Sequence, residues 1–175
     1  RPFKYFPKQM DLRLLMEAAV YIYERMIEDP QVRKDGFTFV ANMKGWTWDN
    51  FTIRYATQWF MLMQFIMPAN ISNWYMVDAP SWFDKVWVLI RPGMTSAFAD
   101  KWKFFKAVED SNAPHILEAI DKNSLPVEMG GNYDIDMQYY CEYRRKVEEG
   151  EIGFKSSMVF DNPQEFMAQM PDFQP

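Results

Sequence analysis

The stretch NWYMVDAPSWFDKVWVLIRPGMTSAFADKWKFF, residues 73–105, decides the fold of this chain. Its pattern predicts a strand, an aromatic helix, a short polar helix and a second strand. The aromatic helix carries two apolar stripes at helical spacing, one formed by Phe83, Trp87, Ile90 and Met94 and the other by Trp82, Val86 and Leu89. A surface helix needs only one such stripe to pack on a core. Two stripes therefore require burial on both sides, or an apolar partner other than protein.

The chain is unusually rich in aromatic residues and methionine. Its 175 residues include 15 Phe, 7 Trp, 9 Tyr and 14 Met. Aromatic side chains carry large contact areas, and Met adapts to irregular surfaces. This mixture suits a cavity wall that accepts a flexible guest, and it also suits a Met-rich core without one. The length fits one domain with a substantial core.

The charge and the cysteine content exclude several classes of protein. The net charge is −5 and the isoelectric point is near 5.0, without a block of basic residues, which argues against a nucleic-acid partner. Cys141 is the only cysteine, so no intrachain disulfide can form, and we expect a reducing, cytoplasmic compartment. No apolar run reaches the ~18 residues of a membrane-spanning helix. We expect a monomer.

The rest of the chain predicts two strand–helix–strand units in succession. Strands are expected at residues 36–42, 74–78 and 101–105. In addition to the aromatic helix that Pro80 starts, helices are expected at 11–28, 49–66, 113–121 and 136–149. A polar loop is expected at 30–36. Right-handed connections make such strands parallel. Phe37, Phe39, Trp102 and Phe104 then form a face that needs covering. We predict an α/β fold with a largely parallel sheet, helices on one face and the aromatic helix over the other.

No set of residues indicates catalysis or a metal site. The seven glycines fit neither a dinucleotide fingerprint nor a phosphate loop, and no serine lies in a Gly-x-Ser-x-Gly motif. A single histidine, His115, and a single cysteine argue against a zinc site and against a nucleophile–base pair. We expect Cys141 to be a half-buried structural thiol. We therefore predict neither an enzyme nor a bound metal or cofactor.

Three charged side chains are candidates for contact with a ligand headgroup. Asp78 ends a strand at the carboxyl edge of the predicted parallel sheet, where ligands tend to bind. The alternative is that Asp78 caps the turn at Pro80. Arg91 in the aromatic helix and Lys101 on the last strand could meet a lipid phosphate or membrane headgroups, or could be exposed charges that favour solubility.

Four motifs in order resemble one known family. They are GFTFVANMKG at residues 36–45, WYMVDAPSWF at 74–83, Arg91-Pro92 followed by Lys101, and LPVEMGG at 125–131. Together they resemble the CRAL-TRIO lipid-binding domain, over roughly residues 1–135. We expect this domain at residues 1–135, and a C-terminal helix with an irregular tail at 136–175.

The resemblance implies a mixed sheet whose floor lines a lipid pocket, with a mobile helical gate that closes it. By position, the floor would consist of Phe37, Phe39, Ala41, Met76, Trp102 and Phe104, and the gate of Phe83, Trp87, Ile90 and Met94. Lys101, Asp78 and Arg91 would lie near the headgroup. The ligand would be a phospholipid or another hydrophobic small molecule, and no cofactor is implied.

The resemblance also implies a function. The chain would bind a single hydrophobic lipid in an internal pocket and transfer or present it at membranes, as a cytoplasmic protein with transient, peripheral membrane contact. The alternative is a membrane-targeting or regulatory module of a larger signalling protein, such as a phosphatase or a small-GTPase regulator.

The chain departs from the family pattern at several positions. Asn42 replaces the usual Asp, Asp78 the usual Asn, Gly93 a Phe of the gate, and Phe98 a Thr. Gly93 would widen the pocket or loosen the gate. Phe98 puts phosphoinositide binding in doubt, so that a more neutral lipid fits equally well. Gly130 and Gly131 would supply backbone angles that other residues resist.

Overall fold

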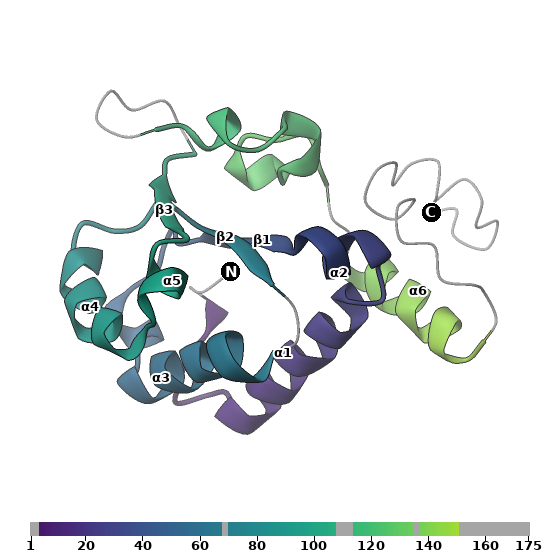
Figure 1. Cartoon of the computed structure of the whole chain (residues 1–175), viewed down its shortest axis with the longest axis horizontal. Coiled ribbons are helices and arrows are strands. Elements are labelled where there is room, and N and C mark those ends of the chain that lie inside the picture. Colours follow the sequence, from purple (N-terminus) through teal and green to yellow (C-terminus); the bar gives the residue numbers. More distant parts are fainter. Residues whose placement is uncertain (1–3, 68–69, 108–113, 135–136, 151–175) are drawn as a thin grey trace. The chain divides into compact units, whose positions relative to one another are not determined.

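The computed structural model of the chain describes residues 4–67, 70–107, 114–134 and 137–150. It contains two units, residues 1–116 and a second that begins at Leu117, and each is described by itself. The first unit is built on a parallel sheet in the order β1-β2-β3, with β1 at Phe37–Asn42, β2 at Ile71–Val77 and β3 at Trp102–Phe105 (Figure 1). The predicted α/β class is confirmed, and so is the parallel pairing of these strands.

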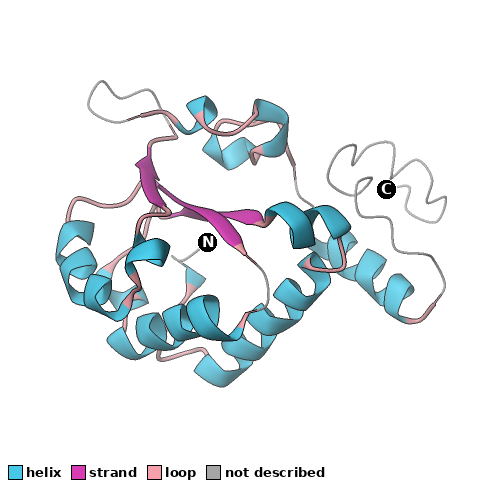
Figure 2. Cartoon of the chain, viewed as in Figure 1, coloured by secondary structure: helices cyan, strands magenta, loops and turns pink. Residues whose placement is uncertain are grey.

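Helices connect and cover the strands (Figure 2). The first unit contains α1 (Leu12–Met26), α2 (Pro30–Asp35), α3 (Ile53–Met61) with a π-helical turn (Leu62–Ile66), α4 (Phe83–Ile90) and α5 (Ser96–Ala99), and the second unit contains α6 (Met137–Glu148). Side-chain caps start four of them, because the side chains of Asp11, Asp29, Thr52 and Thr95 accept hydrogen bonds from backbone N–H groups of α1, α2, α3 and α5.

The strand register builds an aromatic face on the sheet. Phe39 pairs with Trp74 and Trp74 with Trp102, while Ala41 pairs with Met76 and Met76 with Phe104. Alternate residues of a strand point to the same side, so the two rows belong to one face. The ring of Trp74 stacks on Phe39 and on Trp102, with 4.2 Å and 4.9 Å between the ring centroids.

Helices α3 and α4 cover the same face of the sheet. Ala56 and Phe60 of α3 share a buried core with Val86 of α4 and with Trp74 of the central strand. In Figure 1 both helices lie on one side of the strands. The expected division, with the aromatic helix alone on its own face, is therefore corrected. Successive right-handed crossovers that step in one direction across a sheet place both connecting helices on the same side.

The segment predicted as a polar loop at residues 30–36 contains a helix. Asp29 caps α2 by accepting a hydrogen bond from the Gln31 N–H at 2.7 Å, and Pro30 occupies the first turn. Proline suits that position because its fixed φ is already helical and its missing N–H has no role there. The prediction of a loop was wrong because Pro30, with the Asp29 cap before it, starts a helix.

The predicted helix at residues 49–66 is interrupted. A 3-10 turn at Trp48–Asn50 precedes α3, and the last turn is π-helical. Because a π-helical turn shifts the faces of a helix, Met63 is buried whereas Phe65 and Ile66 are 64% and 65% exposed. Ile66, at the end of the predicted helix, therefore lies outside its buried face. In the predicted helix at 113–121, the described part forms a 3-10 turn at Ile116–Glu118.

The aromatic helix buries one apolar stripe. Phe83, Val86 and Ile90, at spacing i, i+3 and i+7, are buried, whereas Val88 and Leu89 are 71% and 58% exposed. The predicted second stripe is thus divided, with Val86 inside and Leu89 outside. A 3-10 turn at Arg91–Gly93 follows α4, so Met94 is buried from a position beyond the helix.

The Leu125-to-Gly131 motif has a structural role in the second unit. Gly130 has a φ of 86°, in the left-handed region that favours glycine. A Cβ at Gly131 would lie 1.7 Å from the carbonyl oxygen of Leu125, which is itself fully buried.

On α6, Cys141 is exposed and the expectation of a half-buried thiol was wrong, because Tyr143 and Arg144 occupy the buried positions there. The tail predicted after Gly150 lies outside the described residues.

Gly131→Ala should destabilise the protein, because the added methyl group would meet backbone atoms that cannot move aside. We expect the free energy of unfolding, measured by urea titration, to fall by about 2 kcal/mol or more. Gly93→Ala is the matched control, since a Cβ there has no neighbour within 4 Å. It should leave stability unchanged or raise it by less than about 1 kcal/mol. Equal stability of the two variants would contradict the close approach at Gly131.

Candidate functional site

An apolar chamber lies between the sheet and helices α3 and α4. Its volume is about 90 Å³. The strands contribute Phe39, Ala41, Trp74, Met76 and Trp102, and the helices contribute Tyr55, Ala56, Trp59, Phe60, Phe83, Val86 and Ile90. Met43, Trp46, Asn50 and Phe51, which precede α3, complete the lining.

Six of the ten predicted lipid contacts line this chamber. They are Phe39, Ala41, Met76, Phe83, Ile90 and Trp102. The other four lie near it but are not among its lining residues. Phe37 packs on Tyr23 of α1, with 5.4 Å between the ring centroids, and Met94 is buried in the core. Trp87 contacts Phe104 at 5.8 Å between centroids, and Phe104 is 40% exposed. Contact of these ten side chains with a lipid stays a prediction.

Sequence reasoning missed several lining residues, above all Trp74. The signal for Trp74 was present, because it lies two residues before Met76 on a strand and must share its face. Tyr55, Trp59 and Phe60 carried no comparable signal. Their place in the chamber depends on α3 lying on the same side of the sheet as α4, which periodicity along one helix does not reveal.

Few polar groups reach the chamber, and two of them, on Asn50 and Trp74, have partners in the protein. Asn50 is 2% exposed; its side chain donates to the Tyr5 carbonyl at 2.8 Å and accepts from the Thr47 N–H at 2.8 Å. The indole N–H of Trp74 donates to the sulfur of Met76 at 3.2 Å. In contrast, the Nε1 atom of Trp102 is buried and has no hydrogen-bond partner among the described residues.

The chamber carries no charge near neutral pH. None of the side chains that line it in the described structure is Asp, Glu, Lys or Arg. Burial raises the pKa of the Tyr55 phenol well above its ordinary value of 10.0, and the nearby Tyr5 adds to the shift. Burial likewise raises the pKa of Tyr23, with Tyr55 as the second cause. The phenols therefore stay protonated, and an anionic guest finds no countercharge here.

The three headgroup candidates lie apart from the chamber lining. The Lys101 ammonium donates to the side-chain oxygen of Asn70 at 3.1 Å. Asp78 has a φ of 54°, and its carboxylate accepts from the Ala107 N–H at 3.2 Å rather than from the turn at Pro80. Arg91 is half-buried in the 3-10 turn after α4. Their contact with a headgroup remains a prediction.

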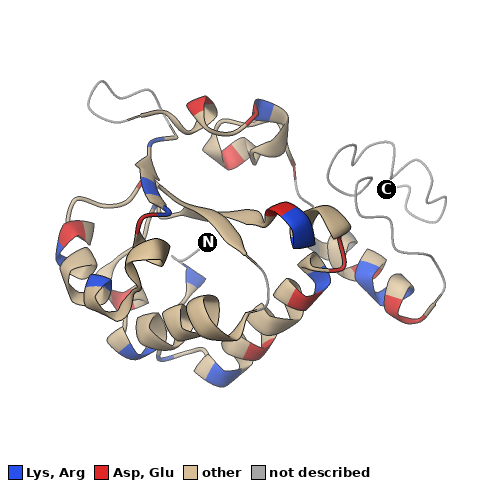
Figure 3. Cartoon of the chain, in the orientation of Figure 1, with Lys and Arg blue, Asp and Glu red and all other residues tan. Residues whose placement is uncertain are grey.

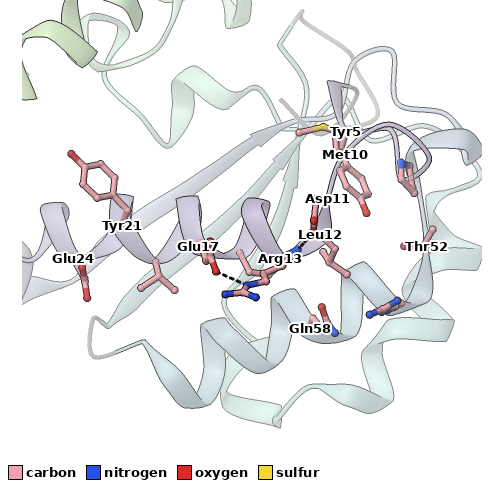
Figure 4. Close-up of a pocket in the computed structure, with 14 residues that line it drawn as sticks. Tyr5, Met10, Asp11, Leu12, Arg13, Glu17, Tyr21, Glu24, Thr52 and Gln58 are labelled. Carbon is pink, nitrogen blue, oxygen red and sulfur yellow. Dashed lines mark hydrogen bonds and ion pairs between the residues drawn. The ribbon is translucent and has the colours of Figure 1, made fainter. Parts of the chain in front are cut away.

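A second, larger hollow runs between α1 and α3 (Figure 4). Its volume is about 900 Å³, and its lining mixes apolar side chains with charged ones. Arg13 and Glu17 form an ion pair at 2.7 Å within it, and Gln58 reaches towards them from α3 in Figure 4. None of the predicted site residues lines this groove. The chamber therefore remains the candidate site, because it combines the predicted residues with an apolar wall.

Gln64 ties the end of α3 to the segment that follows α4. Its side-chain N–H donates to the Gly93 carbonyl at 3.3 Å, and its side-chain oxygen accepts from the Thr95 N–H at 2.7 Å. These bonds hold the backbone on both sides of Met94. The aromatic helix is thus anchored at its C-terminal end by one neutral side chain, while its outer residues Val88 and Leu89 face solvent.

Comparison with known proteins places the chain in a family. The CRAL/TRIO domain family matches residues 1–131, which is most of the chain. The chain therefore belongs to the CRAL/TRIO family, a family of lipid-binding domains.

The similar proteins are longer than this chain. Tyrosine-protein phosphatase non-receptor type 9 of Mus musculus is 21% identical over 131 residues, which cover 75% of this chain and 21% of the phosphatase. The Homo sapiens protein of that name gives the same values. Clavesin-2 of Rattus norvegicus is 26% identical over 125 residues, which cover 67% of this chain and 36% of the clavesin. The chain thus spans only a part of each relative.

The part of the chain that the structure describes contains neither a membrane-spanning helix nor a cluster of metal ligands. No helix there is both long enough and apolar enough to cross a membrane. No group of three or more His, Cys, Asp or Glu side chains there could hold a metal ion.

Gln64→Ala should loosen the aromatic helix, because both hydrogen bonds to the Gly93–Thr95 backbone are lost. A lost pair of neutral hydrogen bonds costs about 1–3 kcal/mol. We expect amide hydrogen exchange of α4 to rise by roughly 5- to 100-fold, as that energy implies. Gln58→Ala is the matched control on the same helix, since Gln58 is exposed in the groove. Unchanged exchange in Gln64→Ala would show that these bonds do not hold α4.

Proposed function

We propose that this chain binds a single hydrophobic lipid molecule in the apolar chamber and transfers or presents it at membranes. The observation that carries the proposal is the uncharged chamber, walled by aromatic and aliphatic side chains, in a chain of a lipid-binding family. The lipid-binding domain would comprise residues 1–135, with 136–175 as an extension. We expect no catalytic step, and a cytoplasmic monomer that associates peripherally with membranes.

Burial of hydrocarbon supplies the binding energy in this proposal. Each buried methylene group contributes about 0.8 kcal/mol. An acyl chain of ~16 carbons could therefore gain on the order of 10 kcal/mol before the costs of ordering it. Because this term is not directional, hydrocarbon alone selects weakly among lipids of similar length.

Lipid binding requires the chamber to enlarge. Its volume of about 90 Å³ equals that of only a few water molecules, since each takes up roughly 30 Å³ in the liquid. Outward movement of α4 would add volume, because Phe83, Val86 and Ile90 are the part of the lining that α4 supplies. Such lid motions typically take microseconds to milliseconds.

Exposed apolar side chains on α4 and at the end of α3 offer a surface for the membrane. Val88 and Leu89 are 71% and 58% exposed, and Phe65 and Ile66 on the π-helical turn are 64% and 65% exposed. The hydrogen bonds of Gln64 hold this turn beside the end of α4. No charged residue occurs between positions 55 and 77, so most of α3 is tan in Figure 3. Exposed apolar groups of this kind mark contact surfaces.

The second candidate function is a targeting or regulatory module of a larger protein. The chain is similar to a phosphatase, and the matched region makes up only 21% of that protein, which favours this second function. A vesicle assay separates the two functions. Movement of labelled lipid between vesicles supports a carrier, whereas vesicle binding without lipid movement supports a targeting module.

Ala41→Leu should reduce lipid loading, because the larger side chain fills the floor of the chamber. Overpacking typically costs about 1–3 kcal/mol, which corresponds to roughly 5- to 100-fold weaker binding. Native mass spectrometry and lipid extraction of protein purified from cells would measure the loading. Ala18→Leu on the exposed side of α1 is the matched control. If the wild-type chain carries no stoichiometric lipid and moves none between vesicles, the carrier function is wrong.

The double variant Val88→Ser and Leu89→Ser should weaken vesicle binding and slow lipid transfer while the lipid content stays the same. Both side chains point away from the chamber, so only membrane contact is lost. Loss of methyl groups that would otherwise be buried in the membrane predicts roughly tenfold or more weaker vesicle binding. Leu14→Ser tests for a general loss of surface hydrophobicity, since Leu14 on α1 is 64% exposed. A similar loss in both proteins would argue against a specific membrane surface on α4.

A further inference from the structure

The indole N–H of Trp102 is a buried donor without an acceptor. Trp102 is 9% exposed, its ring lines the chamber, and its Nε1 atom has no hydrogen-bond partner among the described residues. A buried N–H that lacks a partner is destabilising, and few occur in native structures. Such a group next to a ligand chamber suggests that its acceptor arrives with the ligand.

The neighbouring Trp74 shows that the environment alone does not leave an indole unpaired. The rings of Trp74 and Trp102 are stacked at 4.9 Å with 8° between their planes. The N–H of Trp74 nevertheless donates to the sulfur of Met76 at 3.2 Å. Two indoles that stack on each other therefore differ in whether the protein supplies an acceptor.

Other unpaired groups and nearby ring faces do not account for Trp102. The Nε atom of Arg25 is also buried without a hydrogen-bond partner among the described residues, but Arg25 does not line the chamber. Phe60 and Phe98 stand edge-on to Trp102 at 5.6 Å and 6.2 Å between ring centroids. An aromatic ring is a weaker acceptor than an oxygen, so a ligand oxygen would be preferred.

We infer that the ligand presents a neutral oxygen acceptor, an ester carbonyl or a hydroxyl on a long apolar chain, to the Trp102 N–H. A carboxylate or phosphate does not fit, because no cationic side chain among the described residues lines the chamber and an unpaired buried anion is very costly. A charged headgroup would stay outside the chamber. The inference rests on the proposed lipid-binding function and adds the class of polar group that the chamber selects.

A ligand series of equal chain length tests this inference on the whole chain. The series consists of an alkane, the methyl ester, the primary alcohol and the carboxylate, each titrated against a displaceable fluorescent acyl probe. We expect the ester or the alcohol to bind about 3- to 10-fold more tightly than the alkane, as one added neutral hydrogen bond implies. The carboxylate should bind less tightly than either. Whichever of ester and alcohol binds more tightly identifies the source of the acceptor.

Trp102→Phe should remove the preference for the acceptor and leave alkane binding in place. Trp74→Phe is the matched control, because it shortens a stacked ring of the same row whose N–H is already bonded to the protein. It should keep the preference. Equal affinities for ester, alcohol and alkane in the wild-type chain would overturn the inference, and so would an unchanged preference in Trp102→Phe.

A spectroscopic measurement on the wild-type chain covers the case in which Trp102→Phe does not fold. The indole N–H resonance of Trp102, assigned through the backbone of β3, should move downfield on addition of the ester and not of the alkane. A resonance that responds alike to both would overturn the inference. If no member of the series binds, the lipid-binding function fails with it; if all bind equally, only the inference about Trp102 fails.

Discussion

Three rings stacked across the sheet, those of Phe39, Trp74 and Trp102, are the contact on which the first unit depends. In-register parallel pairing brings them side by side on one face. Rings of this size bury large apolar areas, so the face they form must be covered. Helices α3 and α4 both cover it, and the chamber is the space between these helices and the rings.

The same arrangement separates affinity from selectivity. Apolar burial attracts any long hydrocarbon chain, because the hydrophobic effect has no directional requirement. Direction enters only through hydrogen bonds, and the side chains of Asn50 and Trp74 at the chamber already bond within the protein. The N–H of Trp102 is a buried donor at the chamber that has no partner among the described residues, and it is free for a guest. A chamber of this kind would hold many lipids and prefer those with a neutral oxygen at the right depth.

The aromatic helix meets two opposed demands. Its inner stripe must stay buried for the sheet face to be covered, yet a guest larger than about 90 Å³ needs α4 to move. The hydrogen bonds of Gln64 offer a physical compromise. They hold the C-terminal end of the helix by two neutral interactions, each weak enough to break and re-form during a lid motion. The exposed Val88 and Leu89 would be stabilised wherever an apolar surface replaces water.

Much of the fold could be predicted from local pattern. The strands at β1, β2 and β3 follow from alternation and β-branched or aromatic residues, and α1 and α5 follow from periodicity and from caps at Asp11 and Thr95. The misses share a cause. α2 depends on a proline used as a helix start, and the exposure of Ile66 depends on a π-helical turn. Neither the proline at the helix start nor the π-helical turn changes the spacing of apolar residues enough to be recognised in a single sequence.

The sequence by itself determined the class of fold, the aromatic side chains of the sheet and the family, because these follow from periodicity and from motifs that are local in the chain. Only the tertiary structure decided that α3 shares the face of α4, that Tyr55, Trp59 and Phe60 line the chamber, and that Trp102 lacks an acceptor where Trp74 has one. The physical reason is that burial and hydrogen-bond partners belong to pairs of residues far apart in sequence. Their identity is set by the direction in which the crossovers step across the sheet, and no local pattern encodes that direction.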